Sequence, residues 1–291
     1  MQEIRCECCQ YKMVPRFKNI YKKEHIEIYQ CPNCKLYWAP QLQMDDTFHS
    51  RLDERNRVEA IVKLRETEFQ NVLMCIKKHS CGNKMLEVGC SYGWFMQMAE
   101  KAGFDVEGIE PEVEIAKQAY SKGLKVTTGY FPQDVIHGGY NIIVFNNVWE
   151  HINHSHEMIA ACDDILSQDG TRNILAITVP LSSGILFQIS ALLEKVGVTE
   201  YMTRLWQLHF HSPHIYFFTK ENMNRFFEPR GYRLVEFQEI RSIDSSKMKE
   251  RFLMDKTERF AGIKAKLFAI AWKILKFLPA DKALFIYERT T

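Results

Sequence analysis

Four cysteines near the start of the chain have the spacing of a metal site. Cys6 and Cys9 form one Cys-x-x-Cys pair, and Cys31 and Cys34 form a second pair 21 residues further on. Two such pairs supply the four thiolates of a tetrahedral Zn²⁺ site, and a closed four-cysteine site is structural rather than catalytic. We therefore predict a structural zinc ribbon, against the alternative of clustered free thiols. Cys8 competes with Cys6 or Cys9, but the two-residue gap favours those two.

A glycine turn and an acid have the spacing of a nucleoside-binding site. In LEVGCSYGWF (86–95), Gly89 and Gly93 stand where an apolar run ends and a helical pattern begins. Glycine lets the backbone turn sharply and approach a ligand. Glu110 ends the next apolar run, 21 residues after Gly89, where an acid can accept hydrogen bonds from both ribose hydroxyls. The alternative is an α/β sheet with an unrelated acid. The Gly-x-x-x-Gly spacing disfavours a nicotinamide oxidoreductase.

The elements that must position these residues alternate along the chain. Apolar runs of strand length lie at 85–88, 106–109, 124–127, 141–145 and 173–179. Helical patterns lie at 92–102, 112–122 and 156–167, the last with Ser155 as its expected N-cap. Apolar strands separated by helices predict a parallel sheet covered on both faces. Later helices are expected at 184–196, 220–228 and within 247–278, and later strands at 232–238 and 283–288.

Several of these stretches resemble the class I S-adenosylmethionine-dependent methyltransferases, in particular the small-molecule branch with an N-terminal zinc-ribbon segment. The matching stretches are LEVGCSYGWF, VEGIEP, NIIVFNNVWEHI and ILSQDGTRNILAITVP. The resemblance implies an α/β fold: a Rossmann-like, seven-stranded, doubly wound, mostly parallel sheet with a reversed last strand. A small N-terminal zinc ribbon and helical additions complete it. Two positions depart from the family pattern, Ser91 for a middle glycine and Asn141 for an aspartate.

The resemblance also implies a site for S-adenosylmethionine, which leaves the reaction as S-adenosylhomocysteine. The residues that match cofactor-binding positions are Glu87, Gly89, Cys90, Ser91, Gly93, Glu110, Pro111, Tyr130, Phe131, Asn146 and Asn147. By this match Glu110 binds the ribose, and Tyr130 and Phe131 contact the adenine. Asn146 and Asn147 face the methionine moiety.

Methyl transfer from a sulfonium mainly requires orientation and exclusion of water, and it requires a base only for an un-ionised hydroxyl or a carbon acid. His151, after the fourth strand, is the candidate catalytic base, and packing under the cofactor suits it equally well. The stretch HIYFFTKENMNRFFEPRGYRLVEF resembles the family's segment before the sixth strand, which implies that His214 and Tyr216 face the acceptor. A metal site of His209, His211 and His214 is the disfavoured alternative, because the run has no helical i, i+4 histidine pair.

We expect three segments: a zinc ribbon at 1–42, a helical linker or lid at 43–80, and the methyltransferase core at 81–291. Within the core we expect an acceptor-site insertion at about 181–222, a helical insertion at about 244–280 and the last strand at about 283–288. The predicted function is methylation of a small metabolite or saccharide at oxygen, carbon or nitrogen. The alternatives are a zinc-ribbon RNA methyltransferase and a non-enzymatic cofactor-binding interaction module.

Composition narrows the classes further. With 46% hydrophobic and 25% charged residues and a formal charge of +2, the chain is typical of a globular protein and not of a nucleic-acid binder. The sequence NNVWEH also lacks the D/N-P-P-Y type motif that clamps a flipped base. Nine cysteines, an odd number, and no apolar run at the N-terminus lead us to expect a cytoplasmic protein.

A basic stretch, residues 247–278, is predicted to form amphipathic helix. It carries nine Lys or Arg residues against three acids. Such a helix either covers the sheet or makes a weak contact with a membrane surface, and we favour the covering role. The expected partner is a small-molecule acceptor such as a saccharide or a lipid-linked molecule, with no nucleic acid, and the oligomeric state is left open.

Overall fold

The structure is a computed structural model of the 291-residue chain. It describes residues 3–18, 26–43, 54–208, 210, 212–241, 277–290 and six positions between 262 and 270, with side chains from residue 65 onward in the first helix. The chain forms two compact units. Unit 1 comprises Met1–Thr67, Pro180–Thr219 and Glu239–Ala283, and unit 2 comprises Glu68–Val179, Lys220–Gln238 and Leu284–Thr291.

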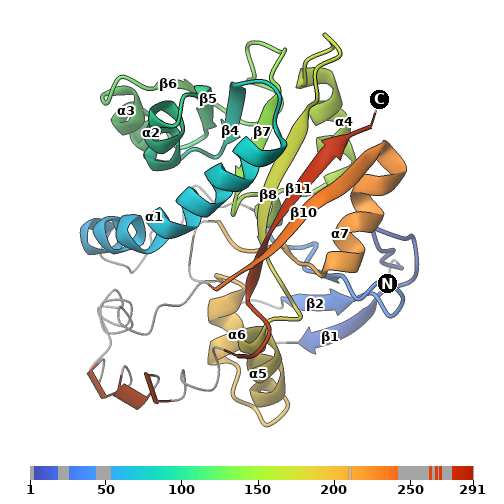
Figure 1. The fold of residues 1–291 in the computed structure, drawn as a ribbon. Coiled ribbons are helices and arrows are strands. Elements are labelled where there is room, and N and C mark those ends of the chain that lie inside the picture. Colours follow the sequence, from blue (N-terminus) through green and yellow to red (C-terminus); the bar gives the residue numbers. More distant parts are fainter. Residues whose placement is uncertain are drawn as a thin grey trace. The chain divides into compact units, whose positions relative to one another are not determined.

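Unit 2 is built on a seven-stranded sheet with the order β10-β11-β8-β7-β4-β5-β6 (Figure 1). Its strands are β4 (Lys84–Val88), β5 (Asp105–Glu110), β6 (Lys125–Thr128), β7 (Ile142–Asn146), β8 (Ile174–Pro180), β10 (Tyr232–Ile240) and β11 (Lys282–Arg289). Strands β4 to β8 pair in parallel. Strand β11 runs the other way, because Arg289 at its end donates its N–H to the carbonyl of Asn173, just before β8 begins.

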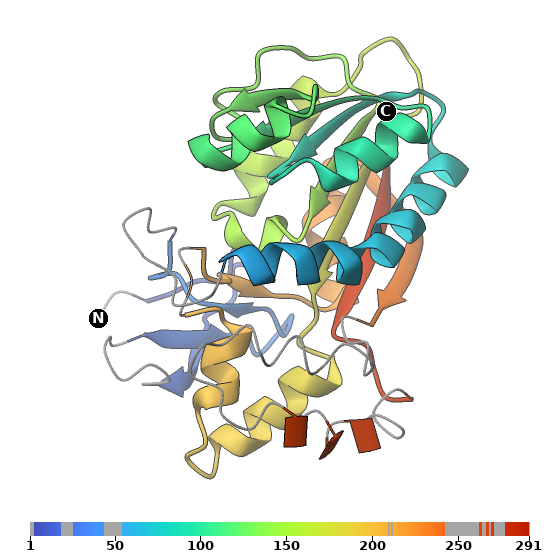
Figure 2. The same ribbon diagram turned by 90° about the vertical axis from the view of Figure 1, so that its left-hand side faces the viewer.

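Helices cover both faces of this sheet (Figures 1 and 2). Helices α2 (Trp94–Lys101) and α3 (Val113–Tyr120) lie on one face, and α4 (Ser155–Ile165) and α7 (Lys220–Phe227) lie on the other. Every residue of β7 and β8 is buried. Strands covered on both faces need apolar residues at consecutive positions, which is why these two strands read as continuous apolar runs. The remaining elements are α1 (Glu54–His79) and the 3₁₀ turns η1 (Trp149–His151) and η2 (Glu228–Arg230).

Unit 1 contains a four-stranded antiparallel sheet, β1-β2-β3-β9. Its strands are β1 (Val14–Lys18), β2 (Glu27–Gln30), β3 (Tyr37–Trp38) and β9 (Tyr216–Phe217), and its helices are α5 (Ile185–Glu194) and α6 (Glu200–Leu205). The ring of Phe187 lies 4.8 Å, centroid to centroid, from the rings of both Tyr37 and Phe217. The cysteine-rich segment therefore shares its core with the segment that follows β8, because so short a segment buries little apolar area alone.

The predicted fold class is confirmed: the sheet is seven-stranded, mostly parallel and covered on both faces. The predicted N-cap is wrong. Helix α4 begins at Ser155 and its N-cap is His154, which has a left-handed φ of 62°. His209, His211 and most of 247–278 lie outside the described residues. No helix among the described residues is long and apolar enough to cross a membrane.

Candidate active site and cysteine cluster

The glycine turn joins β4 to α2 through left-handed backbone. The φ angles are 66° at Gly89, 51° at Ser91 and 73° at Gly93. A Cβ on Gly89 would lie 2.6 Å from Cγ2 of Val148. Both the left-handed backbone and the lack of space therefore disfavour a side chain at this position. The backbone N–H groups of Gly89 and Cys90 donate to the carbonyl of Ile109, which holds the turn against β5.

Ser91 occupies the position where the family pattern often has a glycine. Its φ of 51° is the left-handed conformation that glycine favours. The departure seen in the sequence therefore leaves the shape of the turn intact.

Glu110 connects the glycine turn to the end of β5. Its Oε2 accepts the backbone N–H of Ser91 over 2.8 Å, and its Oε1 accepts the backbone N–H of Glu112 over 3.0 Å. The residue is 7% exposed. Each carboxylate oxygen has a second lone pair, so the group can still accept hydrogen bonds from a ligand at the turn.

Two further pairs of polar residues lie near the end of β7, one formed with β4 and the other with α1. The side-chain amide of Asn146 donates to Oε1 of Glu87 over 3.0 Å, and both residues are buried. Asn147 has a left-handed φ of 58°, and its amide donates to Oε1 of Glu68 over 3.4 Å. The carboxyl ends of the parallel strands β4 and β7 thus bring Glu87 to the amide of Asn146.

Cys90 is a space-filling residue inside the turn. It is 3% exposed, and a Cβ on Gly108 would lie 2.6 Å from its Sγ. Burial, and then the negative charges of Glu87 and Glu110, raise the pKa of the Cys90 thiol. The thiol is therefore neutral at physiological pH and is a poor nucleophile.

The other predicted residues of unit 2 follow β5, β6 and β7 along the chain. Tyr130 is 47% exposed just after β6, and the ring of Phe131 packs 5.5 Å from that of Phe145. His151 ends η1, and its Nε2 lies 4.0 Å from Oε1 of the buried Glu150. Pro111 follows Glu110 directly.

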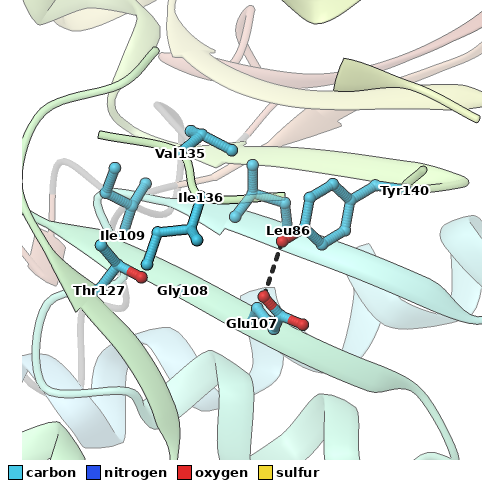
Figure 3. Close-up of a pocket in the computed structure, with 8 residues that line it drawn as sticks. All are labelled: Leu86, Glu107, Gly108, Ile109, Thr127, Val135, Ile136 and Tyr140. Atoms are coloured by element: carbon cyan, nitrogen blue, oxygen red, sulfur yellow. Dashed lines mark hydrogen bonds between the residues drawn. The ribbon is translucent and has the colours of Figure 1, made fainter. Parts of the chain in front are cut away.

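A small pocket lies on the sheet face opposite α2 and α3 (Figure 3). Its lining residues are Leu86, Glu107, Gly108, Ile109, Thr127, Val135, Ile136 and Tyr140. The hydroxyl of Tyr140 donates to Glu107 over 2.8 Å at one side of it. Residues 129–139, which contain no helix, cover this part of the sheet. No predicted site residue lines the pocket, so it is a gap under a loop and not the candidate active site.

The four cysteines of unit 1 converge as the spacing predicts. The sulfur atoms of Cys6, Cys9, Cys31 and Cys34 lie within 4.8 Å of one another. The Cys6–Cys34 and Cys9–Cys31 sulfur distances are both 3.5 Å. A tetrahedral site with Zn–S bonds of about 2.3 Å has sulfur–sulfur distances of about 3.8 Å. The donor set and its geometry therefore fit Zn²⁺.

The two Cys-x-x-Cys pairs have the same backbone geometry. The N–H of Gln10 donates to the carbonyl of Cys6 over 2.8 Å, and the N–H of Lys35 donates to that of Cys31 over 3.0 Å. Gln10 and Lys35 are both left-handed, with φ of 59° and 63°. Hydrogen bonds from Cys6 and then from Cys8 lower the pKa of the Cys34 thiol, which places Cys8 beside the cluster as a fifth thiol.

His214 and Tyr216, the predicted acceptor residues, belong to unit 1. The Nε2 of His214 is 2.7 Å from Nε2 of Gln207. The ring of Tyr216 stacks on Trp38 with 6.1 Å between centroids, and its hydroxyl donates to Oε2 of Glu7 over 2.6 Å. Tyr216 is fully buried, so its hydrogen bond fixes the wall formed by β3 and β9.

The sequence patterns did not identify two acids, Glu68 and Glu7, that form hydrogen bonds with predicted site residues. Glu68 lies four residues before Val72, on the apolar face of α1, where a charged residue signals a partner. Glu7 lies between Cys6 and Cys8, and no pattern connects it to Tyr216.

Comparison with known proteins places the chain among methyltransferases. A family model described as a methyltransferase domain matches residues 55–237, more than half of the chain. No curated protein sequence matches the chain significantly.

Solved structures share the fold at low sequence identity. A SAM-dependent methyltransferase of Thermotoga maritima is 13% identical with a TM-score of 0.52, and the alignment covers 81% of this chain and 96% of that one. Magnesium protoporphyrin IX methyltransferase of Synechocystis, with bound S-adenosylhomocysteine, is 13% identical with a TM-score of 0.51 and coverages of 80% and 86%.

Proposed function

Because the chain belongs to the methyltransferase-domain family and is a class I S-adenosylmethionine-dependent methyltransferase, we propose that it methylates a small metabolite or saccharide. The main support for a cofactor site is the hydrogen bond between Glu110 and the glycine turn. The acid that would bind the ribose also accepts the N–H of Ser91. One carboxylate thus sets both the shape of the turn and the position of the ribose hydroxyls.

The residues present at the strand ends fit the cofactor. Gly89 leaves no space for a side chain, so the backbone itself can approach the ligand. Glu87, a buried acid that accepts a hydrogen bond from Asn146, would accept a further one from the ammonium group of the methionine moiety. Tyr130 and Phe131 would contact the adenine, and Asn147 would face the methionine moiety. The cofactor supplies a methyl group already activated on its sulfonium.

The protein's own contribution is to orient the acceptor and exclude water. For an un-ionised hydroxyl or a carbon acid, His151 would accept the proton at its imidazole. The neighbouring Glu150 carboxylate, 1% exposed, would stabilise the resulting imidazolium. The other role open to His151 is to pack under the cofactor. A rate of methyl transfer that depends on pH is expected only if His151 acts as the base.

We propose that the zinc site and the wall formed by β3 and β9 are structurally coupled, and that this wall faces the acceptor. Glu7 stands between cysteines of the cluster and accepts the Tyr216 hydroxyl, so ordering the cluster also orders β9, which begins two residues after His214. A zinc ion held by Cys6, Cys9, Cys31 and Cys34 would be structural, because four protein ligands leave no open coordination position.

A labelled-methyl transfer assay tests this function. Purified protein and methyl-labelled S-adenosylmethionine are incubated with separate pools of sugars, sugar nucleotides, small phenols, lipids and RNA. Label in a sugar or small-metabolite pool supports the proposal, and label in RNA alone supports the RNA methyltransferase instead. Cofactor binding without transfer to any pool supports an interaction module.

A further inference from the structure

A lysine outside the predicted site also holds the glycine turn. The ammonium group of Lys122 donates a hydrogen bond to the backbone carbonyl of Tyr92 over 2.7 Å. Tyr92 lies between Ser91 and Gly93, which both have left-handed backbone. Lys122 belongs to the loop between α3 and β6, whereas Glu110, which accepts the N–H of Ser91, ends β5. Side chains from two different elements therefore hold adjacent residues of the turn.

The peptide group between Tyr92 and Gly93 is held at both of its polar atoms. Its carbonyl accepts the hydrogen bond from Lys122. Its N–H, which belongs to Gly93, donates to the carbonyl of Cys90 over 2.9 Å. Because a peptide group is planar, the two hydrogen bonds together fix its orientation. Glycine has more backbone freedom than any other residue, so without Lys122 this peptide group could rotate more easily.

Packing supports the same connection between the loop and the turn. The rings of Tyr92 and Trp94 stack with 4.9 Å between their centroids, and Nζ of Lys122 lies 5.9 Å from the centroid of the Trp94 ring. Leu124 is 2% exposed and fills the space beside Gly93, where an added Cβ would overlap its Cδ1. The loop between α3 and β6 thus packs against the glycine turn, with Lys122 as a polar contact between them.

We propose that Lys122 is a positioning residue that orders the glycine turn in advance of S-adenosylmethionine binding. The inference rests on the proposed cofactor site and assigns Lys122 no contact with the cofactor itself. A turn that is already ordered loses no binding free energy to ordering when the ligand arrives. Without the Lys122 hydrogen bond, only a fraction of the molecules would have the turn in its binding conformation, and the apparent affinity would fall by that fraction. A merely structural role would leave the affinity unchanged.

Isothermal titration of S-adenosylmethionine into wild-type, Lys122→Met and Lys122→Arg protein tests the proposal. Methionine keeps an unbranched side chain but cannot donate, so we expect the affinity to fall about three- to tenfold, the equivalent of one hydrogen bond. Arginine keeps a donor and should restore most of the affinity. Lys117→Met is the matched control, because Lys117 is an exposed lysine of α3 that pairs with Glu114. This variant should bind the cofactor with wild-type affinity.

Hydrogen exchange of the ligand-free proteins gives an independent readout of the turn. The amides of residues 86–95 should exchange faster in Lys122→Met than in the wild type or Lys117→Met, because the turn opens locally more often. The thermal midpoint should stay close to that of the wild type, since the polar contacts of an exposed lysine contribute little to global stability.

The outcomes separate this inference from the cofactor site on which it rests. Failure of the wild type to bind S-adenosylmethionine would contradict the cofactor site and the role of Lys122 together. Binding by the wild type with equal affinity in Lys122→Met would overturn only the role of Lys122. Unchanged exchange of residues 86–95 in Lys122→Met, a loss of affinity that Lys122→Arg does not restore, or an equal loss in Lys117→Met would also overturn that role.

Discussion

The hydroxyl of Tyr216 donates a 2.6 Å hydrogen bond to the carboxylate of Glu7, which lies 209 residues earlier in the chain. Glu7 stands between Cys6 and Cys8, and Tyr216 begins β9, the strand that completes the sheet of the cysteine-rich segment. The cysteine cluster and the predicted acceptor residue Tyr216 are therefore parts of one folded structure.

This hydrogen bond should be measurable as a coupling between Glu7 and Tyr216. We expect Glu7→Ala and Tyr216→Phe each to lower the free energy of unfolding, because each removes the hydrogen bond, and we expect the double variant to lose less than the sum. A coupling of about 1–2 kcal/mol is expected for a partly buried bond to a carboxylate. Denaturant unfolding of the four proteins measures it. Strictly additive losses would mean that the two side chains do not interact.

Zinc should be present in a ratio of one ion per chain. Cys31→Ser should lose the ion and lower the thermal midpoint, because a structural zinc site contributes directly to folding. Cys8→Ser is the matched control and should keep the ion, because Cys8 lies outside the two Cys-x-x-Cys pairs that are predicted to bind it. Elemental analysis of the three proteins decides. A zinc-free wild type, or retention of the ion by Cys31→Ser, would rule out the site.

Gly89→Ala should destabilise the protein more than Gly103→Ala does. Both glycines have positive φ, 66° and 92°, so both alanines strain the backbone. The Cβ of an alanine at position 89 would lie 2.6 Å from Cγ2 of Val148. At Gly103, by contrast, nothing lies within 4 Å of an added Cβ. The β-branched valine cannot rotate away easily, so we expect an extra cost of about 1–3 kcal/mol.

Chemical denaturation measures that difference, and Val148→Ala provides a second check. Removing both Cγ atoms should recover part of the loss caused by Gly89→Ala. Equal losses at Gly89 and Gly103 would show that crowding at the turn is unimportant.

Cys90 should resist alkylation in the folded protein. Burial first, and then the charges of Glu87 and Glu110, raise its pKa, so little reactive thiolate forms near neutral pH. Cys81 is exposed and should react with iodoacetamide under the same conditions. Peptide mass spectrometry follows both sites, with unfolded protein as the reference in which both react. Similar rates at the two cysteines in the folded protein would contradict this environment for Cys90.

Much of the unit 2 sheet could be predicted because its strands are locally encoded. The buried run of β7 and the turn at Gly89 each carry a pattern within a few residues. The pairing of Trp38 with Tyr216 could not be predicted, because two-residue strands carry no periodicity and their contact is long-range. The N-cap at Ser155 was wrong because His154 adopts left-handed backbone and takes that position.

The site divides in the same way. Glu110 and the glycine turn could be found from spacing alone, since they lie at the ends of successive strands. The partnership of Glu68 with Asn147 depends on how α1 packs near the end of β7, which a residue pattern does not determine. Its signal was only a charged residue on an apolar helix face.

Isothermal titration of S-adenosylmethionine into wild-type and Glu110→Ala protein tests the central claim most directly. Two hydrogen bonds from ribose hydroxyls to a carboxylate are worth about 3 kcal/mol or more together, so affinity should fall by about a hundredfold or more. Glu114→Ala is the matched control, because Glu114 is an exposed acid on α3. This variant should bind the cofactor with wild-type affinity. Wild-type affinity in Glu110→Ala, or no binding by the wild type, would contradict the account.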